Sequence, residues 1–169
     1  MYDDLEGWLL RCSEKLDIDL DHLFVNDGPA LQWFHVIYVD LGPIPEAQLR
    51  ILLEQAREES ARRALEIMRQ EIRFYRKRIL EAEIEEGPSE WVEGARGFYF
   101  LGVEVRSWIL EYSILEIGDA VQGEVVERDW GVWPVCAVHG VGVHLKIVRD
   151  RVVWWCRPYG HVLRIIYPV

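Results

Sequence analysis

Several features that would place the chain in a membrane or a secretory pathway are missing from the sequence. No apolar run approaches the roughly 20 residues that a membrane-spanning helix needs. The N-terminus begins Met1-Tyr2-Asp3-Asp4 and lacks the basic flank and apolar stretch of a signal peptide. We therefore expect a cytoplasmic protein with no membrane association.

Amides and threonine are also scarce. The 169 residues contain a single Asn, no Thr, and three Lys beside sixteen Arg. Few thermolabile amides together with many Glu and Arg would suit a thermophile, although genomic base composition produces the same bias. This feature bears on habitat and indicates nothing about function.

Motifs that would mark a common enzyme class are absent as well. The chain contains no H-E-x-x-H, no H-x-E partnered with P-C-x-x-C, and no Gly-rich phosphate loop. Its five serines stand in no recognisable nucleophile context. Cys12 falls on the apolar face of an expected helix, which favours a core thiol over a nucleophile.

Charge is distributed unevenly along the chain. Half of the residues are apolar and the length fits one domain or a small domain with an appended module. Residues 128–169 hold six basic and two acidic side chains, whereas residues 1–127 hold 13 basic and 27 acidic ones. An acidic body argues against general nucleic-acid binding by the whole chain, because phosphate contacts supply most non-specific affinity.

The periodicity of apolar residues predicts the elements of residues 1–127. Residues 2–16 have helical spacing, residues 31–39 are rich in β-branched and aromatic residues and predict a strand, and residues 46–86 contain no Gly or Pro. The predicted 46–86 helix carries a continuous apolar stripe, with a break near Ser60 as the alternative. Residues 97–126 fit either state, and their glycines and β-branched residues favour strands.

Residues 38–56 resemble a known family. The turn from Leu41 to Pro45, Leu-Gly-Pro-Ile-Pro, followed by an amphipathic helix, is similar to the strand-to-helix junction of the type III secretion chaperone-like family. The resemblance implies a small α/β sandwich that is usually dimeric, binds partner proteins and catalyses no reaction.

The strongest chemical signal lies near the C-terminus. Cys136 and His139 form C-x2-H, nineteen residues separate Cys136 from Cys156, and Cys156 and His161 form C-x4-H. A hairpin between the pairs would bring the four donors together, as in a zinc ribbon, and four protein ligands close a zinc tetrahedron in a structural site. His144 is an alternative fourth ligand. Inert core thiols and a Cys136–Cys156 disulfide are the alternatives to a metal.

The same segment combines aromatic and basic residues. Trp154 and Trp155 are adjacent in a predicted strand and point to opposite faces. With Arg149, Arg151 and Arg157 they could form an interaction surface that anchors a protein or stacks nucleic-acid bases. A core role for the tryptophans in a small ribbon is the alternative.

These observations together predict an α+β protein. We expect a small acidic α/β body over residues 1–127, with the long helix 46–86, and a zinc-ribbon-like β module over residues 128–169. The expected function is that of a non-enzymatic, chaperone-like adaptor that binds a protein partner and self-associates through helix 46–86. A nucleic-acid-binding zinc ribbon is the first alternative, and a hydrolase with an open three-ligand zinc site is the second.

Overall fold

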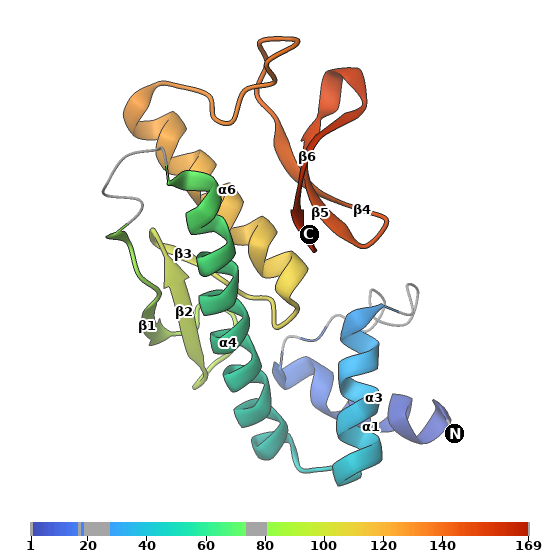
Figure 1. Ribbon diagram of the computed structural model, residues 1–169. Coiled ribbons are helices and arrows are strands. Elements are labelled where there is room, and N and C mark those ends of the chain that lie inside the picture. The colour runs from blue at the N-terminus through green and yellow to red at the C-terminus, as the bar shows by residue number, and fades with distance from the viewer. Residues whose placement is uncertain (1, 17, 19–27, 74–80, 169) are drawn as a thin grey trace.

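The computed structural model describes residues 2–16, 18, 28–73 and 81–168. Figure 1 shows two long helices side by side, with a small antiparallel sheet on either side of them and two shorter helices near the start of the first long helix. The elements in chain order are α1 Tyr2–Leu16, α3 Pro29–Leu41, α4 Glu46–Ile72, β1 Glu85–Pro88, β2 Arg96–Phe100, β3 Val103–Glu104, α6 Leu110–Asp129, β4 His144–Val148, β5 Arg151–Cys156, the 3-10 helix η1 Arg157–Tyr159 and β6 His161–Tyr167. The predicted α+β class is confirmed. No helix in the described ranges is long and apolar enough to cross a bilayer.

The N-terminal helices form a hydrophobic cluster of their own with the start of α4. The predicted helix 2–16 is confirmed as α1, and the side chains of its apolar face, Cys12 among them, are buried. The indole N–H of Trp8 donates to the backbone oxygen of Ile44 at 2.9 Å, which fixes α1 to the turn before α4. The cluster consists of Leu5, Trp8, Leu9, Cys12, Leu16, Ile18, Leu31, Phe34, Ile44, Leu49 and Leu53.

The predicted strand 31–39 is wrong, because these residues lie within α3. Pro29 stands at the first helical position, and Gly42 follows the last with φ +74° and donates its N–H to the oxygen of Tyr38. Proline at a helix start and glycine just past its end are strong helix signals, and here they prevail over the strand preference of the aromatic and β-branched residues. Helix α3 thus occupies the place of the strand on which the family resemblance rests.

Helix α4 is shorter than predicted. It begins at Glu46 as expected and ends at Ile72, and residues 74–80 lie outside the described part of the chain. The prediction of helix to residue 86 is wrong, since Glu85–Pro88 pairs as strand β1 with β2. The alternative break near Ser60 is also wrong, because the helix runs through it and Ser60 shares a hydrogen bond of 2.8 Å with Ser113 of α6.

The strands predicted over 97–126 are confirmed only at β2 and β3, because most of that segment is helix α6. Its buried side chains recur at helical steps of three and four, and the helix packs along α4 through the small residues Ser60, Ala61 and Ala64. The described part of the α4 stripe is therefore covered within the chain by α6 and by the N-terminal cluster. Self-association through residues 46–86 stays a prediction. The exposed apolar stripe that motivated it is absent from the described part of α4.

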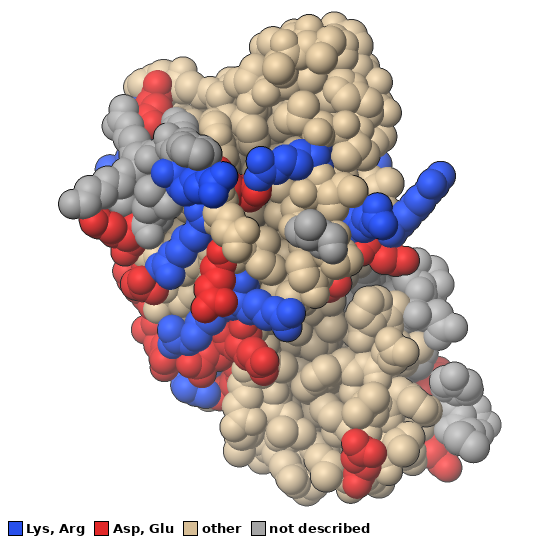
Figure 2. All heavy atoms as spheres, viewed as in Figure 1, with Lys and Arg blue, Asp and Glu red and all other residues tan. Residues whose placement is uncertain are grey.

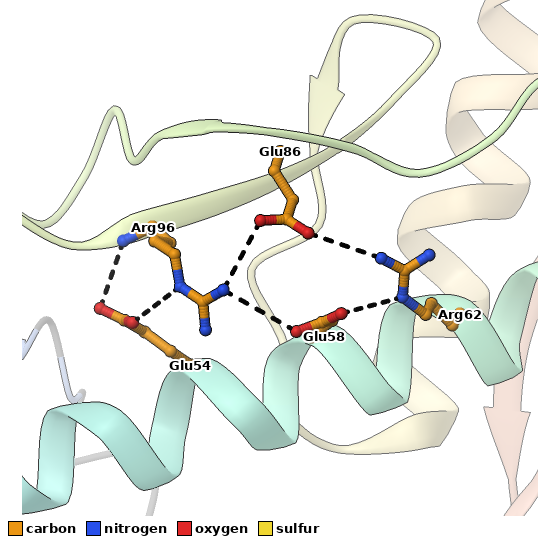
Figure 3. Close-up of polar contacts among 5 residues, drawn as sticks. All are labelled: Glu54, Glu58, Arg62, Glu86 and Arg96. Carbon is orange, nitrogen blue, oxygen red and sulfur yellow. Dashed lines mark hydrogen bonds and ion pairs between the residues drawn. The ribbon is translucent and has the colours of Figure 1, made fainter.

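The sheet β1–β2–β3 is held against α4 by an exposed network of charged side chains. Figure 3 shows Arg96 of β2 between three carboxylates, with its Nε at 3.2 Å from Glu54 and its Nη1 at 3.5 Å from Glu86. Arg62 extends the network from Glu58 at 3.1 Å to Glu86 at 3.6 Å. Each exposed pair contributes about 0 to 1 kcal/mol, so the network orients this sheet more than it stabilises it.

The C-terminal sheet β4–β5–β6 shares the core of the long helices. Its core-facing side chains, among them Val152, Trp154 and Ile166, belong to the same buried cluster as α4, α6 and β2. Cys136 and Cys156 are part of that cluster. The buried clusters thus divide along α4, while the boundary at 127/128 stays a prediction. Figure 2 shows charged side chains concentrated over α4 and the β1–β3 sheet, whereas the upper end of the C-terminal region carries none on this face.

Candidate metal centre

Two short loops carry the predicted ligands. The first spans residues 135–142 and is closed by a bridge between Val135 and Gly142 and by the Cys136 N–H donating to Val141 oxygen at 2.8 Å. The second follows β5 directly and contains η1. Strand register places Cys156 opposite His161, so the end of β5 and the start of β6 lie together at one end of the sheet.

The two loops have the same backbone turn after the cysteine. In each, the residue four positions after Cys is a glycine with positive φ, +67° at Gly140 and +63° at Gly160. Each glycine donates its N–H to the oxygen of its own cysteine at 2.8 Å. Glycine adopts this left-handed conformation without steric cost, which is why the chain can curl around each sulfur.

The imidazole ligands come from different places in the two turns. His139 is the third residue after Cys136, whereas the third residue after Cys156 is Tyr159 and the histidine follows at position five. The Tyr159 ring stacks on the His139 imidazole, with centroids 3.5 Å apart and planes at 8°. Tyr159 was not among the predicted site residues, and the equal spacing of Gly140 and Gly160 behind their cysteines is the signal that could have found it.

The four donor atoms converge on a single point. Their ligand atoms all lie within 4.8 Å of one another. Cys136 Sγ is 3.4 Å from His139 Nδ1 and 3.6 Å from His161 Nε2, and Cys156 Sγ is 3.7 Å from His139 Nδ1. A tetrahedral zinc ion with bonds of about 2.3 Å to sulfur and about 2.0 Å to nitrogen places such atoms about 3.5 Å apart. The four residues therefore lie close enough to hold a metal ion.

Surrounding groups give the two thiols different acidities. Burial alone raises the pKa of Cys136, but the backbone N–H groups of His139 and Val138 and the Cys156 thiol bond to its sulfur and bring its pKa below the ordinary value. Burial and the neighbouring Cys136 sulfur raise the pKa of Cys156. Without an ion, Cys136 therefore loses its proton at a lower pH than Cys156 does. A bound metal would ionise both sulfurs, because it replaces their protons.

Helix α6 holds the first loop in place. Gln122 donates from Nε2 to the backbone oxygen of Trp133 at 2.9 Å and to that of Val143 at 2.7 Å. These carbonyls flank the loop on both sides, so one side chain fixes its entry and its exit. The donor set is therefore positioned by the protein core as well as by the sheet.

The other candidates lie elsewhere. His144 is outside the cluster, on β4 opposite Trp155. Cys136 and Cys156 are free thiols rather than a disulfide.

One residue of the predicted interaction surface, Trp154, is not on the surface. Trp154 is buried against the core, and its Nε1 donates to Glu71 of α4 at 3.1 Å, so it is unavailable to a partner. Arg149, Arg151 and Arg157 are exposed and Trp155 is half-buried.

Comparison with known proteins adds no further assignment. No protein-family model, no curated protein and no solved structure matches the chain.

Proposed function

We propose that Cys136, His139, Cys156 and His161 bind one structural zinc ion, and that the chain is a non-enzymatic adaptor that binds a protein partner through the region the ion stabilises. The convergence of two thiols and two imidazoles at tetrahedral spacing is the observation that carries the proposal. Thiolate and imidazole donors suit zinc, and four of them leave no coordination position for water.

The position of the donors supports a structural role for the ion. It would join two segments that lie apart in the sequence, the loop before β4 and the turn that links β5 to β6. Structural zinc contributes on the order of 10 kcal/mol to small modules. The ion would therefore stabilise one end of the C-terminal sheet by linking these two segments.

The surface near the centre supports protein binding. Trp130 is 94% exposed and Val138, in the first loop, is 78% exposed. Two further exposed side chains, Val132 and Val135, lie just before Cys136 in the sequence, and Tyr159 is exposed in the turn after Cys156. Large exposed apolar side chains are common at protein interfaces, where a few of them provide most of the affinity.

The experiment is metal analysis combined with native mass spectrometry of the purified chain. We expect one zinc per chain in the wild type and none in Cys136→Ser/Cys156→Ser. His144→Ala is the matched control, because it removes a nearby imidazole outside the cluster, and it should keep its zinc. Full zinc content in the double cysteine variant, or no zinc in wild type expressed with zinc, would refute the assignment.

The adaptor role is tested on the same samples. We expect a protein partner recovered with wild type to be lost with Trp130→Ser/Val138→Ser while zinc content stays at one per chain. Recovery of the same partner by that variant would contradict the proposed surface.

A further inference from the structure

The register of the C-terminal sheet gives its two faces different chemistry. Directly opposed residues of paired strands share a face. Leu145, Trp154 and Val152 pack toward the core of α4 and α6. The opposite face, here called the outer face, consists of His144, Lys146, Val148, Arg151, Val153, Trp155, Val162 and Ile165.

The outer face carries cations without carboxylate partners. Lys146 and Arg151 lie on it, and Arg157 follows directly after β5. None of these three side chains forms an ion pair within the described ranges. In contrast, Arg164, which lies on the core side of β6, pairs with Glu71. Within the strands of the C-terminal sheet, the positive charge without an ion-pair partner therefore lies on the outer face.

A groove on this face places the cations beside an aromatic ring. It has a volume of about 310 Å³ and is lined by His144, Leu145, Lys146, Trp155 and Arg157. The Lys146 ammonium lies 4.9 Å from the centroid of the Trp155 ring. Across the sheet, the β6 side has a different character, because Val162, Leu163 and Ile165 of β6 are exposed. The surface therefore runs from basic at β4 through an indole to apolar at β6.

We propose that the outer face binds an acidic segment of a partner protein that also carries apolar side chains, an inference that rests on the proposed adaptor function. Carboxylates of the segment would meet Lys146 and Arg157, and its apolar side chains would cover Trp155 and the β6 edge. Charge complementarity selects the occupant. A nucleic acid fits less well, because Lys146 already covers the indole, one rim is apolar and the chain has a net charge of −10.

The test is fluorescence anisotropy with labelled synthetic peptides of equal length. The probe is a peptide in which Asp and Leu alternate. The comparison probes alternate Asp with Ser and Lys with Leu, and a single-stranded oligothymidine is included. We expect the Asp–Leu peptide to bind at least about tenfold more tightly than every other probe, and we expect its affinity to fall as the salt concentration is raised. Equal or tighter binding of any comparison probe would overturn the proposal, with the oligonucleotide indicating a nucleic-acid site instead.

Charge reversal locates the site. Lys146→Glu/Arg157→Glu should lower the affinity for the Asp–Leu peptide at least about tenfold, because two attractions become repulsions. Arg11→Glu/Arg63→Glu is the matched control, since it makes the same change in net charge at exposed positions on α1 and α4, and should alter binding less than about twofold. The milder Lys146→Gln/Arg157→Gln repeats the test if the reversal disturbs folding.

Zinc content separates this inference from the proposed function. If wild type lacks zinc, the proposed metal site fails irrespective of peptide binding. If the wild type, the Lys146→Glu/Arg157→Glu variant and the Arg11→Glu/Arg63→Glu control all hold one zinc per chain and bind the peptide equally, the outer-face inference fails while the metal site stands.

Discussion

Glu116 of α6 is a half-buried carboxylate that holds the chain entering its own helix. Its Oε2 accepts the backbone N–H of Arg106 at 3.0 Å and that of Ser107 at 3.1 Å. Burial raises the pKa of Glu116, and the two N–H donors and the nearby arginines offset this only in part. The charged form is therefore disfavoured in the folded protein. This residue contributes most to stability below the unfolded-state pKa, and the contribution falls as pH rises through the folded-state pKa.

Replacing this carboxylate with an amide should reveal that pH dependence. Glu116→Gln keeps an oxygen for the two N–H groups, so we expect it to match or exceed the wild type by up to about 1 kcal/mol near pH 7, with the difference shrinking toward pH 4. Glu116→Ala should cost about 1 to 3 kcal/mol, because both N–H groups lose their acceptor. Urea unfolding at several pH values measures this, with Glu127→Gln as the control on the same helix. A Gln variant less stable than wild type at pH 7 would contradict this interpretation.

At the candidate site, residue spacing was enough to predict the four donors but not their surroundings. The C-x2-H and C-x4-H pairs are local signals, and the hairpin that unites them is short. Trp154 and Trp155 point to opposite faces of β5, and the sequence does not show which face packs against the helices. It therefore could not predict which of the two tryptophans is buried. The stacking of Tyr159 on His139 depends on the second turn repeating the first, a relation between distant segments.

Among the helices and sheets, the contact between α6 and β4 is unusually close. A Cβ placed on Gly118 of α6 would clash with Cδ1 of Leu145 and lie 3.2 Å from its Cγ. Gly123, on the same helix, has nothing within 4 Å of its Cβ position. Because Gly118 has no side chain, Leu145 of the C-terminal sheet can pack directly against the backbone of α6. Gly123 makes no such contact and only lowers the helix propensity of α6.

This pair of glycines provides a matched comparison. Gly123→Ala should stabilise the protein by up to about 1 kcal/mol through helix propensity. Gly118→Ala should lose that gain and destabilise by about 1 to 3 kcal/mol, because the added methyl group displaces Leu145. Combining Gly118→Ala with Leu145→Ala should show coupling between the two sites in denaturant unfolding. Equal stabilisation by both glycine substitutions would contradict the contact.

The mispredictions at α3 and α6 share one physical cause. In α3 and α6, aromatic and β-branched residues favoured strands locally, yet both segments bury side chains at helical spacing against other helices. Only the helix terminus signals at Pro29 and Gly42 were available in the sequence to decide α3. Helix α1 was predictable because its composition and its apolar periodicity agree. The end of α4 was not, because no Gly or Pro marks Ile72.

At the scale of the whole molecule, the candidate metal centre and the helical core are continuous. Both cysteines belong to the cluster that contains Ile72, Phe98 and Phe100. Glu71 of α4 reinforces the connection, because its two oxygens accept from Trp154 and Arg164 of the C-terminal sheet. Loss of the ion should therefore weaken more than its own loops.

Chelation tests this continuity. Removing zinc should lower the melting temperature by more than roughly 10 °C, because structural zinc can contribute on the order of 10 kcal/mol and each kcal/mol shifts the melting temperature by about 2 to 4 °C in a chain of this size. We expect the C-terminal sheet and the α4–α6 core to unfold in one transition, followed by calorimetry and by tryptophan fluorescence. Two separate transitions, with only the first sensitive to the chelator, would instead support an independent module beginning near residue 128.

The most direct measurement of the central proposal is X-ray absorption at the zinc edge of the purified protein. We predict a four-coordinate shell with two sulfurs at about 2.3 Å and two imidazole nitrogens at about 2.0 Å. In His161→Ala the shell should lose one nitrogen, and in His144→Ala it should stay unchanged. A shell containing one sulfur, or an oxygen from water in the wild type, would contradict the closed site.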